Sequence, residues 1–275
     1  MSFTLEGVDF GYEGRPVIRA LDLALPPGRF YGVLGPNGSG KTTLIDLLSG
    51  HRTPDSGTIR YMDRPLGRFS RRDLAREMAL VPQQFAVDFP FTVQEVVLMG
   101  RYPHIPRFAA PAGEDRAAAG RVMAQTGIAG FADRRITELS GGERQRVVFA
   151  RALAQETPVL LLDEATASLD IKHTLALTGL VAERVRNEGR TAIAVLHDMN
   201  LAAACCDHLL FLRSGRKVAF GPVAEVFRPE VIEETFEVPA RVYDDPFTGA
   251  RKVSFVGASA IERGRVSEGR ERATP

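Results

Sequence analysis

The sequence predicts an α/β fold with a buried parallel sheet, and three unbroken apolar runs carry that prediction. These runs are residues 78–81, 159–162 and 192–196. Strands that are apolar on both faces are typical of a parallel sheet covered by helices on each side. A further apolar stretch, residues 30–34, leads through a glycine-rich loop into the helix-like stretch 43–48. We therefore expect the three unbroken runs to be buried parallel strands.

The flanking segments predict other kinds of structure. Residues 3–5, 21–25 and 57–62 look like strands, the last of them an edge strand. The imperfect alternation of residues 3–10 is typical of half-buried antiparallel strands. Residues 92–154 are predominantly helix-like, and Pro103, Pro106 and Pro111 interrupt them. That stretch therefore resembles a helical insertion rather than a strand–helix–strand repeat.

Composition is ordinary for a soluble globular chain, with 275 residues, 44% hydrophobic and 25% charged. This length suits one large domain, or a core with a subdomain. The net charge of +1 implies no general attraction to nucleic acid, so we expect no nucleic-acid partner. No apolar run approaches the roughly 20 residues of a membrane helix, and no signal segment opens the chain. Cys205 and Cys206 are adjacent in a helix-like stretch, so we expect two small buried thiols rather than a disulfide or a metal pair.

The glycine-rich loop fits the phosphate-binding pattern G-x-x-x-x-G-K-[ST]. It reads Gly35-Pro36-Asn37-Gly38-Ser39-Gly40-Lys41-Thr42-Thr43. Its position between a strand and a helix is the context that this motif requires. Glycines let the backbone wrap closely, so that N–H groups and the helix start point at phosphate oxygens. Lys41 would reach the terminal phosphates, and the Thr42 hydroxyl would hold magnesium.

A second phosphate-binding surface is predicted about a hundred residues later in the chain. It reads Leu139-Ser140-Gly141-Gly142-Glu143-Arg144-Gln145-Arg146. A serine and two glycines would expose N–H groups at the start of a helix near Glu143, although an isolated string of this kind also fits an ordinary helix cap. The string resembles the signature of ATP-binding cassette (ABC) proteins. In that family two subunits pack head to tail, and Ser140, Gly141 and Gly142 would close over the nucleotide in the partner's phosphate loop.

Two carboxylates end the apolar run 159–162. Successive strand side chains point to opposite sides, so Asp163 and Glu164 are expected to do different work. Asp163 would bind magnesium near Thr42. Glu164 would face the γ-phosphate and orient or deprotonate the attacking water. A positioned general base typically contributes about 10²–10⁴ in rate.

Further residues match the family's motifs in order. Gln83 matches the Q-loop glutamine, which touches magnesium and water, and the adjacent Gln84 remains the alternative. His197 matches the switch histidine, which reaches the γ-phosphate, although a lone histidine here also suits a structural hydrogen bond. Asp170, in Ser168-Leu169-Asp170, resembles the D-loop, while Ser-x-Asp is also common helix-capping chemistry. Tyr12 stands where the family stacks an aromatic ring on adenine, although a plain edge-strand tyrosine fits equally.

These motifs cover most of residues 3–218, and the chain resembles the nucleotide-binding subunit of an ABC transporter. The resemblance implies a P-loop NTPase fold: a RecA-like parallel sheet, an antiparallel β-subdomain and a helical signature subdomain. We expect one nucleotide-binding domain over residues 1–256, with the helical subdomain at about 85–155 and a short C-terminal segment at about 219–256. The polar, glycine- and arginine-rich stretch 257–275 is expected to be a disordered tail.

The resemblance also implies partners. No membrane domain is fused to the cassette, so we expect a second copy of the chain, separate permease subunits and, indirectly, a periplasmic or lipoprotein binding protein. The subunit would lie peripherally at the cytoplasmic face of the inner (plasma) membrane. Phe85, Phe89, Phe91, Val96 and Met99 crowd after Gln83, where the family receives a short permease helix. A helical-subdomain core would bury some of these side chains, and we expect Phe91 to belong to the docking surface.

Residues 88–104, and within them Gly100-Arg101-Tyr102-Pro103-His104, resemble subunits that serve ferric siderophore, haem and cobalamin import. The segment 221–253 resembles the short C-terminal segment of the same group. We therefore expect a type II metal-chelate importer, with iron-siderophore or haem ahead of cobalamin. Molybdate or tungstate import and a separate exporter ATPase remain alternatives. A non-transport ABC ATPase is disfavoured, because the chain has one phosphate loop and no long heptad run.

Overall fold

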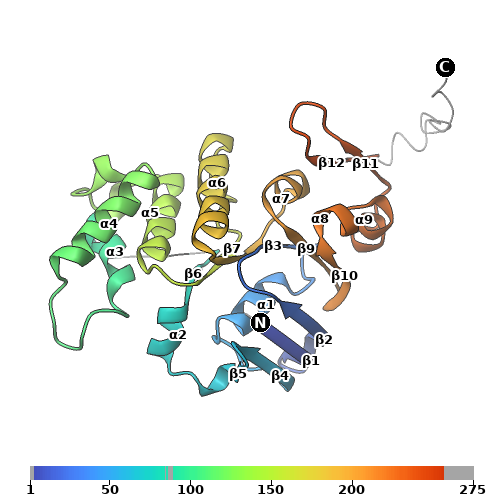
Figure 1. The fold of residues 1–275 in the computed structure, drawn as a ribbon, viewed down its shortest axis with the longest axis horizontal. Coiled ribbons are helices and arrows are strands. Elements are labelled where there is room, and N and C mark those ends of the chain that lie inside the picture. Colours follow the sequence, from blue (N-terminus) through green and yellow to red (C-terminus); the bar gives the residue numbers. More distant parts are fainter. Residues whose placement is uncertain (1–2, 84, 86–88, 257–275) are drawn as a thin grey trace.

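A six-stranded sheet forms the centre of the computed structural model, which describes residues 3–83, 85 and 89–256 (Figure 1). Its strand order is β10-β9-β3-β8-β7-β6, and five strands run parallel while β10 pairs antiparallel with β9. The strands are β3 (Phe30–Leu34), β6 (Met78–Val81), β7 (Val159–Asp163), β8 (Thr191–Val195), β9 (His208–Arg213) and β10 (Arg216–Pro222). The three predicted apolar runs are the strands β6, β7 and β8, so the prediction of buried parallel strands is confirmed.

The sheet separates two hydrophobic cores, because alternate residues of each strand face opposite sides. In β7, Leu160 and Leu162 join the core that also holds Phe149, while Leu161 joins the core that holds Leu44. The first core lies under α5 (Gly141–Ala154), α6 (Ile171–Glu188) and α7 (Met199–Cys205). The second lies under α1 (Lys41–Leu48) and the N-terminal strands.

The N-terminal strands form a separate antiparallel sheet of order β2-β1-β4-β5. These strands are β1 (Phe3–Tyr12), β2 (Arg15–Leu25), β4 (Ser56–Tyr61) and β5 (Arg64–Pro65). Register shifts along β1, between Leu5 and Val8 and again before Phe10, explain the imperfect alternation seen in the sequence. The prediction of an edge strand at 57–62 is wrong, because β4 lies between β1 and the short β5, which returns through a turn at Met62 and Asp63.

Three helices form a group on one side of the central sheet (Figure 1). They are α3 (Val93–Leu98), α4 (Gly113–Gln125) and α5, and the connections between them contain short helical turns such as Met99–Arg101. Pro103, Pro106 and Pro111 lie between that turn and α4, as the sequence indicated. The helix of the signature string begins at Gly141 rather than near Glu143, because Ser140 caps it. A further helix, α2 (Arg71–Glu77), leads directly into β6.

The C-terminal segment adds two helices and a hairpin. These are α8 (Val223–Val226), α9 (Pro229–Phe236), and β11 (Ala240–Asp244) paired with β12 (Arg251–Phe255). The Val253 N–H donates to Asn200 Oδ1 of α7 at 2.7 Å, which fastens the hairpin to the core. Phe247, in the hairpin loop, is 95% exposed. The predicted disordered tail 257–275 lies outside the described residues.

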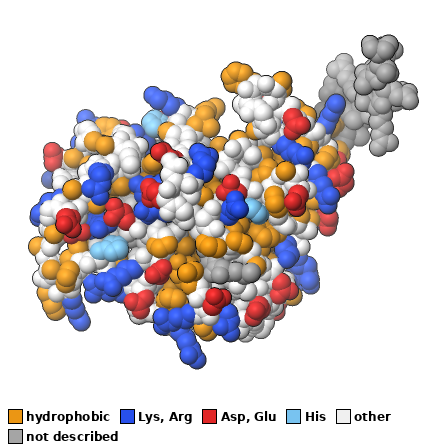
Figure 2. All heavy atoms as spheres, viewed as in Figure 1, with side chains coloured by type: hydrophobic (Ala, Val, Ile, Leu, Met, Phe, Trp, Pro, Cys, Tyr) orange, Lys and Arg blue, Asp and Glu red, His pale blue; other side chains and the backbone are white. Residues whose placement is uncertain are grey.

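Acidic and basic side chains are interspersed over the visible face of the molecule (Figure 2). Throughout the described ranges, every helix falls short of the length or the apolarity that crossing a membrane requires. Cys205 and Cys206 are free thiols whose sulfur atoms lie 3.7 Å apart. Cys206 is buried as expected, and Cys205 is only half-buried.

Candidate functional site

The glycine loop between β3 and α1 is wedged against the backbone of two other strands. A Cβ atom on Gly35 would lie 2.2 Å from the Leu212 carbonyl oxygen, so only glycine fits beside β9. Gly40 has a φ of +99°, and a Cβ atom there would lie 2.7 Å from the Ile18 side chain in β2. Pro36 is half-buried, while Asn37 and Gly38 face solvent. The loop is therefore held from behind and open in front.

The open side of this loop suits an anion. No side chain caps the N-terminus of α1, whose first turn is Lys41, Thr42 and Thr43, and the first N–H groups of a helix have no partner within it. Lys41 Nζ donates to the carbonyl oxygens of Gly35 at 2.9 Å and Pro36 at 3.0 Å. Burial lowers the pKa of Lys41, and the nearby Glu164 and Asp163 carboxylates act in the opposite direction. The Lys41 ammonium group therefore lies within the glycine loop, where its positive charge would attract an anion.

Thr42 and Asp163 place two side-chain oxygen atoms, of the kind that hard cations prefer as ligands, beside the loop. The Thr42 hydroxyl donates to Asp163 Oδ1 at 3.1 Å. Burial raises the pKa of Asp163, and the Thr42 hydrogen bond lowers it. Over the residues described, no cluster of three His, Cys, Asp or Glu side chains could hold a metal alone. Magnesium typically binds one or two protein oxygens and completes its shell with water and phosphate oxygens, so this pair fits it.

Glu164 lies at the centre of the remaining polar groups. Gln83 Nε2 donates to Glu164 Oε2 at 2.7 Å, and His197 Nε2 lies 2.7 Å from Glu164 Oε1. Glu164 itself has a φ of +49°, an uncommon conformation for a residue with a side chain. Its neighbour Asp163 bonds Thr42 instead, so the two acids have separate partners. The alternative Q-loop residue Gln84 lies outside the described residues.

The signature string lies beside the D-loop of its own chain. Ser140 caps α5 in a reciprocal pair with Glu143: the Ser140 hydroxyl donates to Glu143 Oε2 at 2.7 Å, and those hydrogen bonds lower the Glu143 pKa. A Cβ atom on Gly142 would lie 3.5 Å from the Ser168 carbonyl oxygen. Asp170 caps α6 and accepts the His173 N–H at 2.8 Å. Both strings therefore act as helix caps within one copy.

Two groups of predicted site residues thus emerge. Lys41, Thr42, Asp163, Glu164, Gln83 and His197 gather around the glycine loop and the end of β7. The signature and D-loop form the other group, at the start of α5, which stands apart from α1 in Figure 1. Gln145 Nε2 donates to the Ala165 carbonyl at 2.9 Å and so links α5 to the segment after Glu164.

Tyr12 ends β1 with its ring 38% exposed and the Arg52 guanidinium 5.3 Å from the ring centre. Tyr12 pairs in register with Arg15 at the start of β2. Two residues further along β2, the Val17 carbonyl oxygen would lie 3.0 Å from a Cβ atom on Gly40 of the glycine loop. The ring is therefore at the sheet end nearest the glycine loop, and its stacking on adenine stays a prediction.

The sequence motifs did not predict the support that β9 and β10 give to the loop. The Gly215 N–H, in the turn between these strands, donates to the Ser39 carbonyl at 3.2 Å. The apolar run 209–212 before Arg213-Ser214-Gly215 was the available signal for a hairpin.

Comparison with known proteins agrees with this site. The family profile described as "ABC transporter" matches residues 18–167. A hemin import ATP-binding protein of Streptomyces coelicolor, HmuV, is 44% identical over 86% of this chain and 84% of its own length. The ferric enterobactin transport ATP-binding protein FepC of Escherichia coli is 39% identical over 93% of this chain and 94% of its own length. The cobalamin import ATP-binding protein BtuD of Halobacterium salinarum is 42% identical over 92% of this chain, which spans only 63% of that relative.

Solved structures agree. A transporter assigned to the metal-chelate ABC type, in an inward-facing conformation, superposes with a TM-score of 0.80 at 28% identity, covering 94% of this chain and 98% of that one. The cassette MJ0796, solved as a dimer bound to ADP and phosphate, gives a TM-score of 0.71 at 26% identity, covering 80% and 98%. The chain belongs to the ABC transporter family. It is an ATP-binding cassette of the ABC ATPase class.

Replacing Lys41 with alanine is expected to weaken ATP binding about 10- to 150-fold, because a charge-assisted hydrogen bond contributes about 1.5–3 kcal/mol. Equilibrium titration with a fluorescent ATP analogue measures the change. Lys217→Ala, in β10, is the matched control and should bind as the parent does. Unchanged affinity in Lys41→Ala would show that the ammonium does not contact phosphate.

Proposed function

We propose that two copies of this chain, packed head to tail, hydrolyse ATP and thereby drive import of a metal chelate through a separate permease. One observation carries the proposal: the Glu164 carboxylate lies between Gln83 and His197, at 2.7 Å from each, beside the loop that holds Lys41. A general base, two groups that orient it and a phosphate-binding loop are what hydrolysis of a phosphoanhydride requires.

Each residue around the loop has a proposed role. Lys41 and the first turn of α1 bind the phosphates, with the loop from Gly35 to Thr43 wrapped around them. Thr42, Asp163 and Gln83 would hold magnesium, which supplies positive charge against the phosphate oxygens when bound. Tyr12 would stack on adenine. We further propose residues 1–256 as the nucleotide-binding domain, with the helical subdomain at about 85–155.

Glu164 would act as the base. One of its oxygens exchanges its present partner for the attacking water and accepts a proton from it, while the water oxygen bonds to the γ-phosphorus. The bond from that phosphorus to the β–γ bridging oxygen breaks, which leaves ADP and phosphate. His197 would then donate to a γ-phosphate oxygen, and Gln83 would keep the carboxylate oriented.

The position of the signature supports a composite nucleotide site, formed by the phosphate loop of one copy and the signature of the other. Ser140, Gly141 and Gly142 stand at the start of α5 beside the D-loop, away from the phosphate loop of the same copy. A head-to-tail dimer would bring them, with Asp170, to the partner's nucleotide. The dimeric MJ0796 cassette, 26% identical, supports this arrangement.

The proposed cargo rests on the relatives. Their names give hemin, ferric enterobactin and cobalamin, at 44%, 39% and 42% identity. These values are too close to choose one cargo, but all three are metal chelates. The resemblance favours iron-siderophore or haem. A permease, and indirectly a periplasmic or lipoprotein binding protein, would then hold this subunit at the cytoplasmic face of the membrane.

The proposed docking surface for the permease lies near Gln83. A groove of about 390 Å³ runs between α2, β6 and α5, with Leu74 and Leu80 among its apolar walls and Arg151 among its basic ones. Arg151 also lies 4.1 Å from the ring centre of the half-buried Phe85. Beyond it, Phe89 is 69% exposed and Phe91 38% exposed. A groove whose walls are partly apolar and partly basic suits a short amphipathic helix.

The five side chains predicted to crowd here divide between core and surface. Val96 is fully buried and belongs to the core of the helical group. Phe85 and Met99 are half-buried, whereas the Phe89 and Phe91 rings face solvent with their centroids 6.0 Å apart. Phe91 is therefore available to a partner.

Glu164→Gln is expected to bind MgATP but to hydrolyse it at least about 10²-fold more slowly, because an amide of the same shape cannot accept the proton. Trapped ATP should then hold two copies together. Phosphate release and size-exclusion chromatography with ATP measure the two effects, with Glu183→Gln on α6 as control. Wild-type turnover in the Glu164→Gln variant would remove Glu164 as the base.

Ser140→Arg is expected to leave ATP binding to the single copy near normal and to abolish turnover, because Ser140 serves the partner's nucleotide. Mixing it with Lys41→Ala creates heterodimers with one complete site, from the phosphate loop of the first variant and the signature of the second. Activity that returns only on mixing supports the head-to-tail arrangement. Normal hydrolysis by Ser140→Arg alone contradicts it.

Phe91→Asp is expected to keep MgATP affinity within about twofold and to prevent co-purification with the permease, because it places an unpaired charge in an apolar contact. Affinity purification of the complex from membranes measures this. Phe247→Asp, in the loop of the far hairpin, is the control for placing a charge at an exposed phenylalanine, because Phe247 is 95% exposed, and this variant should co-purify normally. Assembly and transport by Phe91→Asp would exclude Phe91 from the docking surface, and global unfolding would indicate a core role instead.

A further inference from the structure

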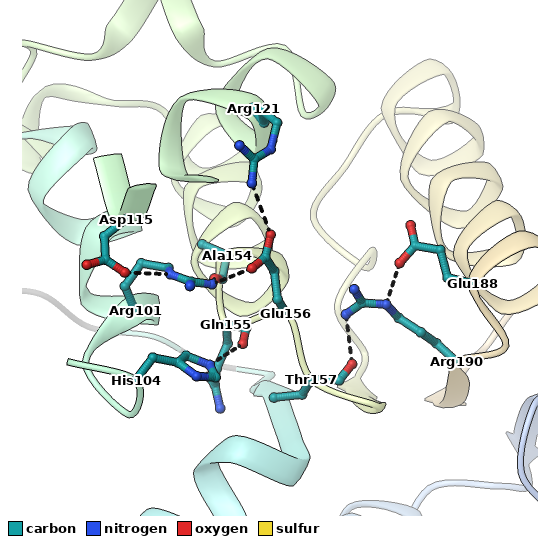
Figure 3. Close-up of polar contacts among 10 residues, drawn as sticks. All are labelled: Arg101, His104, Asp115, Arg121, Ala154, Gln155, Glu156, Thr157, Glu188 and Arg190. Atoms are coloured by element: carbon teal, nitrogen blue, oxygen red, sulfur yellow. Dashed lines mark hydrogen bonds and ion pairs between the residues drawn. The ribbon is translucent and has the colours of Figure 1, made fainter. Parts of the chain in front are cut away.

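Arg101 joins three elements of the helical group through one guanidinium (Figure 3). Its Nε donates to Asp115 Oδ1 in the first turn of α4 at 3.1 Å. Its Nη1 donates at 2.7 Å to the Ala154 carbonyl, the last residue of α5, and at 2.7 Å to Glu156 Oε2. The side chain is only 12% exposed. We call these four residues the Arg101 cluster.

The Arg101 cluster gives the C-terminal end of α5, the signature helix, a hydrogen-bond donor for its last carbonyl group. The last carbonyl groups of a helix have no partner within it and carry partial negative charge, so a buried cation there is favourable. Burial acts to raise the pKa of Glu156, but Arg101 and then Arg121 outweigh it and hold that pKa below its ordinary value. The carboxylate therefore stays charged and the pair stays formed at neutral pH.

Backbone contact fixes the same junction. A Cβ atom on Gly100 would lie 2.2 Å from the Arg151 carbonyl oxygen, so the turn Met99–Arg101 lies directly against α5. This close approach explains the glycine that precedes the arginine.

The contacts continue from the cluster to the central sheet. His104 Nε2 lies 2.8 Å from the Gln155 carbonyl, and Gln155 Nε2 donates to the Met78 carbonyl of β6 at 3.0 Å. The Pro103 carbonyl accepts from Arg76 Nε of α2 at 2.9 Å. Because β6 leads to Gln83 and so to Glu164, the end of α5 is tied to the strand that carries the Q-loop.

We propose that Arg101 is a positioning residue that clamps the turn Met99–Arg101, α4 and the end of α5 into one rigid body, and thereby sets the orientation of Ser140 at the other end of α5. A helix of 14 residues spans about 21 Å, so a small rotation at Ala154 displaces the signature. The inference rests on the proposed function, in which Ser140 closes the partner copy's nucleotide site.

The test uses ATP-driven dimerisation of the full-length Glu164→Gln chain, followed by size-exclusion chromatography over a range of MgATP concentrations. Adding Arg101→Ala is expected to raise the ATP concentration for half-maximal dimerisation about tenfold, within the range by which coupling residues act. ATP affinity of the single copy, measured in a Ser140→Arg background that blocks dimerisation, should stay within twofold. A merely structural role would lower thermal stability without separating these two readouts.

Arg121→Ala is the matched control, because Arg121 also pairs with Glu156, at 3.3 Å, but is 62% exposed and reaches no helix end. It should leave dimerisation unchanged, and an equal shift in both variants would contradict the inference. If Arg101→Ala does not fold, Arg101→Lys replaces it, because lysine keeps the charge but not the three contacts. A smaller rise in the ATP concentration for half-maximal dimerisation then supports the inference, and an unchanged concentration overturns it. Failure of Glu164→Gln itself to dimerise would overturn the proposed function, and this inference with it.

Discussion

The contacts of Glu164 with Gln83 and His197 are those on which the site depends, because they join three separate strand ends. Gln83 follows β6, Glu164 follows β7 and His197 follows β8, and these strands are neighbours in the central sheet. The carboxyl ends of parallel strands meet at one edge, so the topology brings Glu164 into contact with Gln83, 81 residues earlier in the chain, and with His197 of the next strand end. Without that parallel order, neither Glu164 nor the two side chains beside it would have a defined place.

The phosphate loop depends on backbone packing rather than on side chains. Gly35 lies against the Leu212 carbonyl and Gly40 against β2, so strands from both sheets set the loop's shape. Burial lowers the pKa of the buried Lys41 side chain, and the nearby Glu164 and Asp163 carboxylates act against that shift. The same carboxylates thus support the cation in the loop and, in the proposed mechanism, the metal and the water.

Besides the shared hydrophobic core, polar contacts along α5 tie the helical group to this centre. Gln145 touches the segment after Glu164, and Gln155 touches β6, at opposite ends of α5. Between them α5 is a stiff connection from the signature to the region proposed for permease docking. Arg101 lies at the one end where α3, α4 and α5 converge, which is where a change in docking could alter the signature with little other rearrangement.

Local patterns in the sequence determined the parallel strands, the phosphate loop, the signature and the paired acids, because each depends on spacing along a short stretch. Burial on both faces made β6, β7 and β8 visible as apolar runs, and Lys41 and Thr42 follow a glycine pattern that has few other uses. The hairpin β9–β10, the inner position of β4 and the contact of Gln83 with Glu164 depended on strand order, which no local pattern contains. The Arg101 cluster shows the same limit: no local pattern pairs Arg101 with Asp115 and Glu156, and only packing of the helices shields Arg101 and Asp115 from water and brings the three charges together.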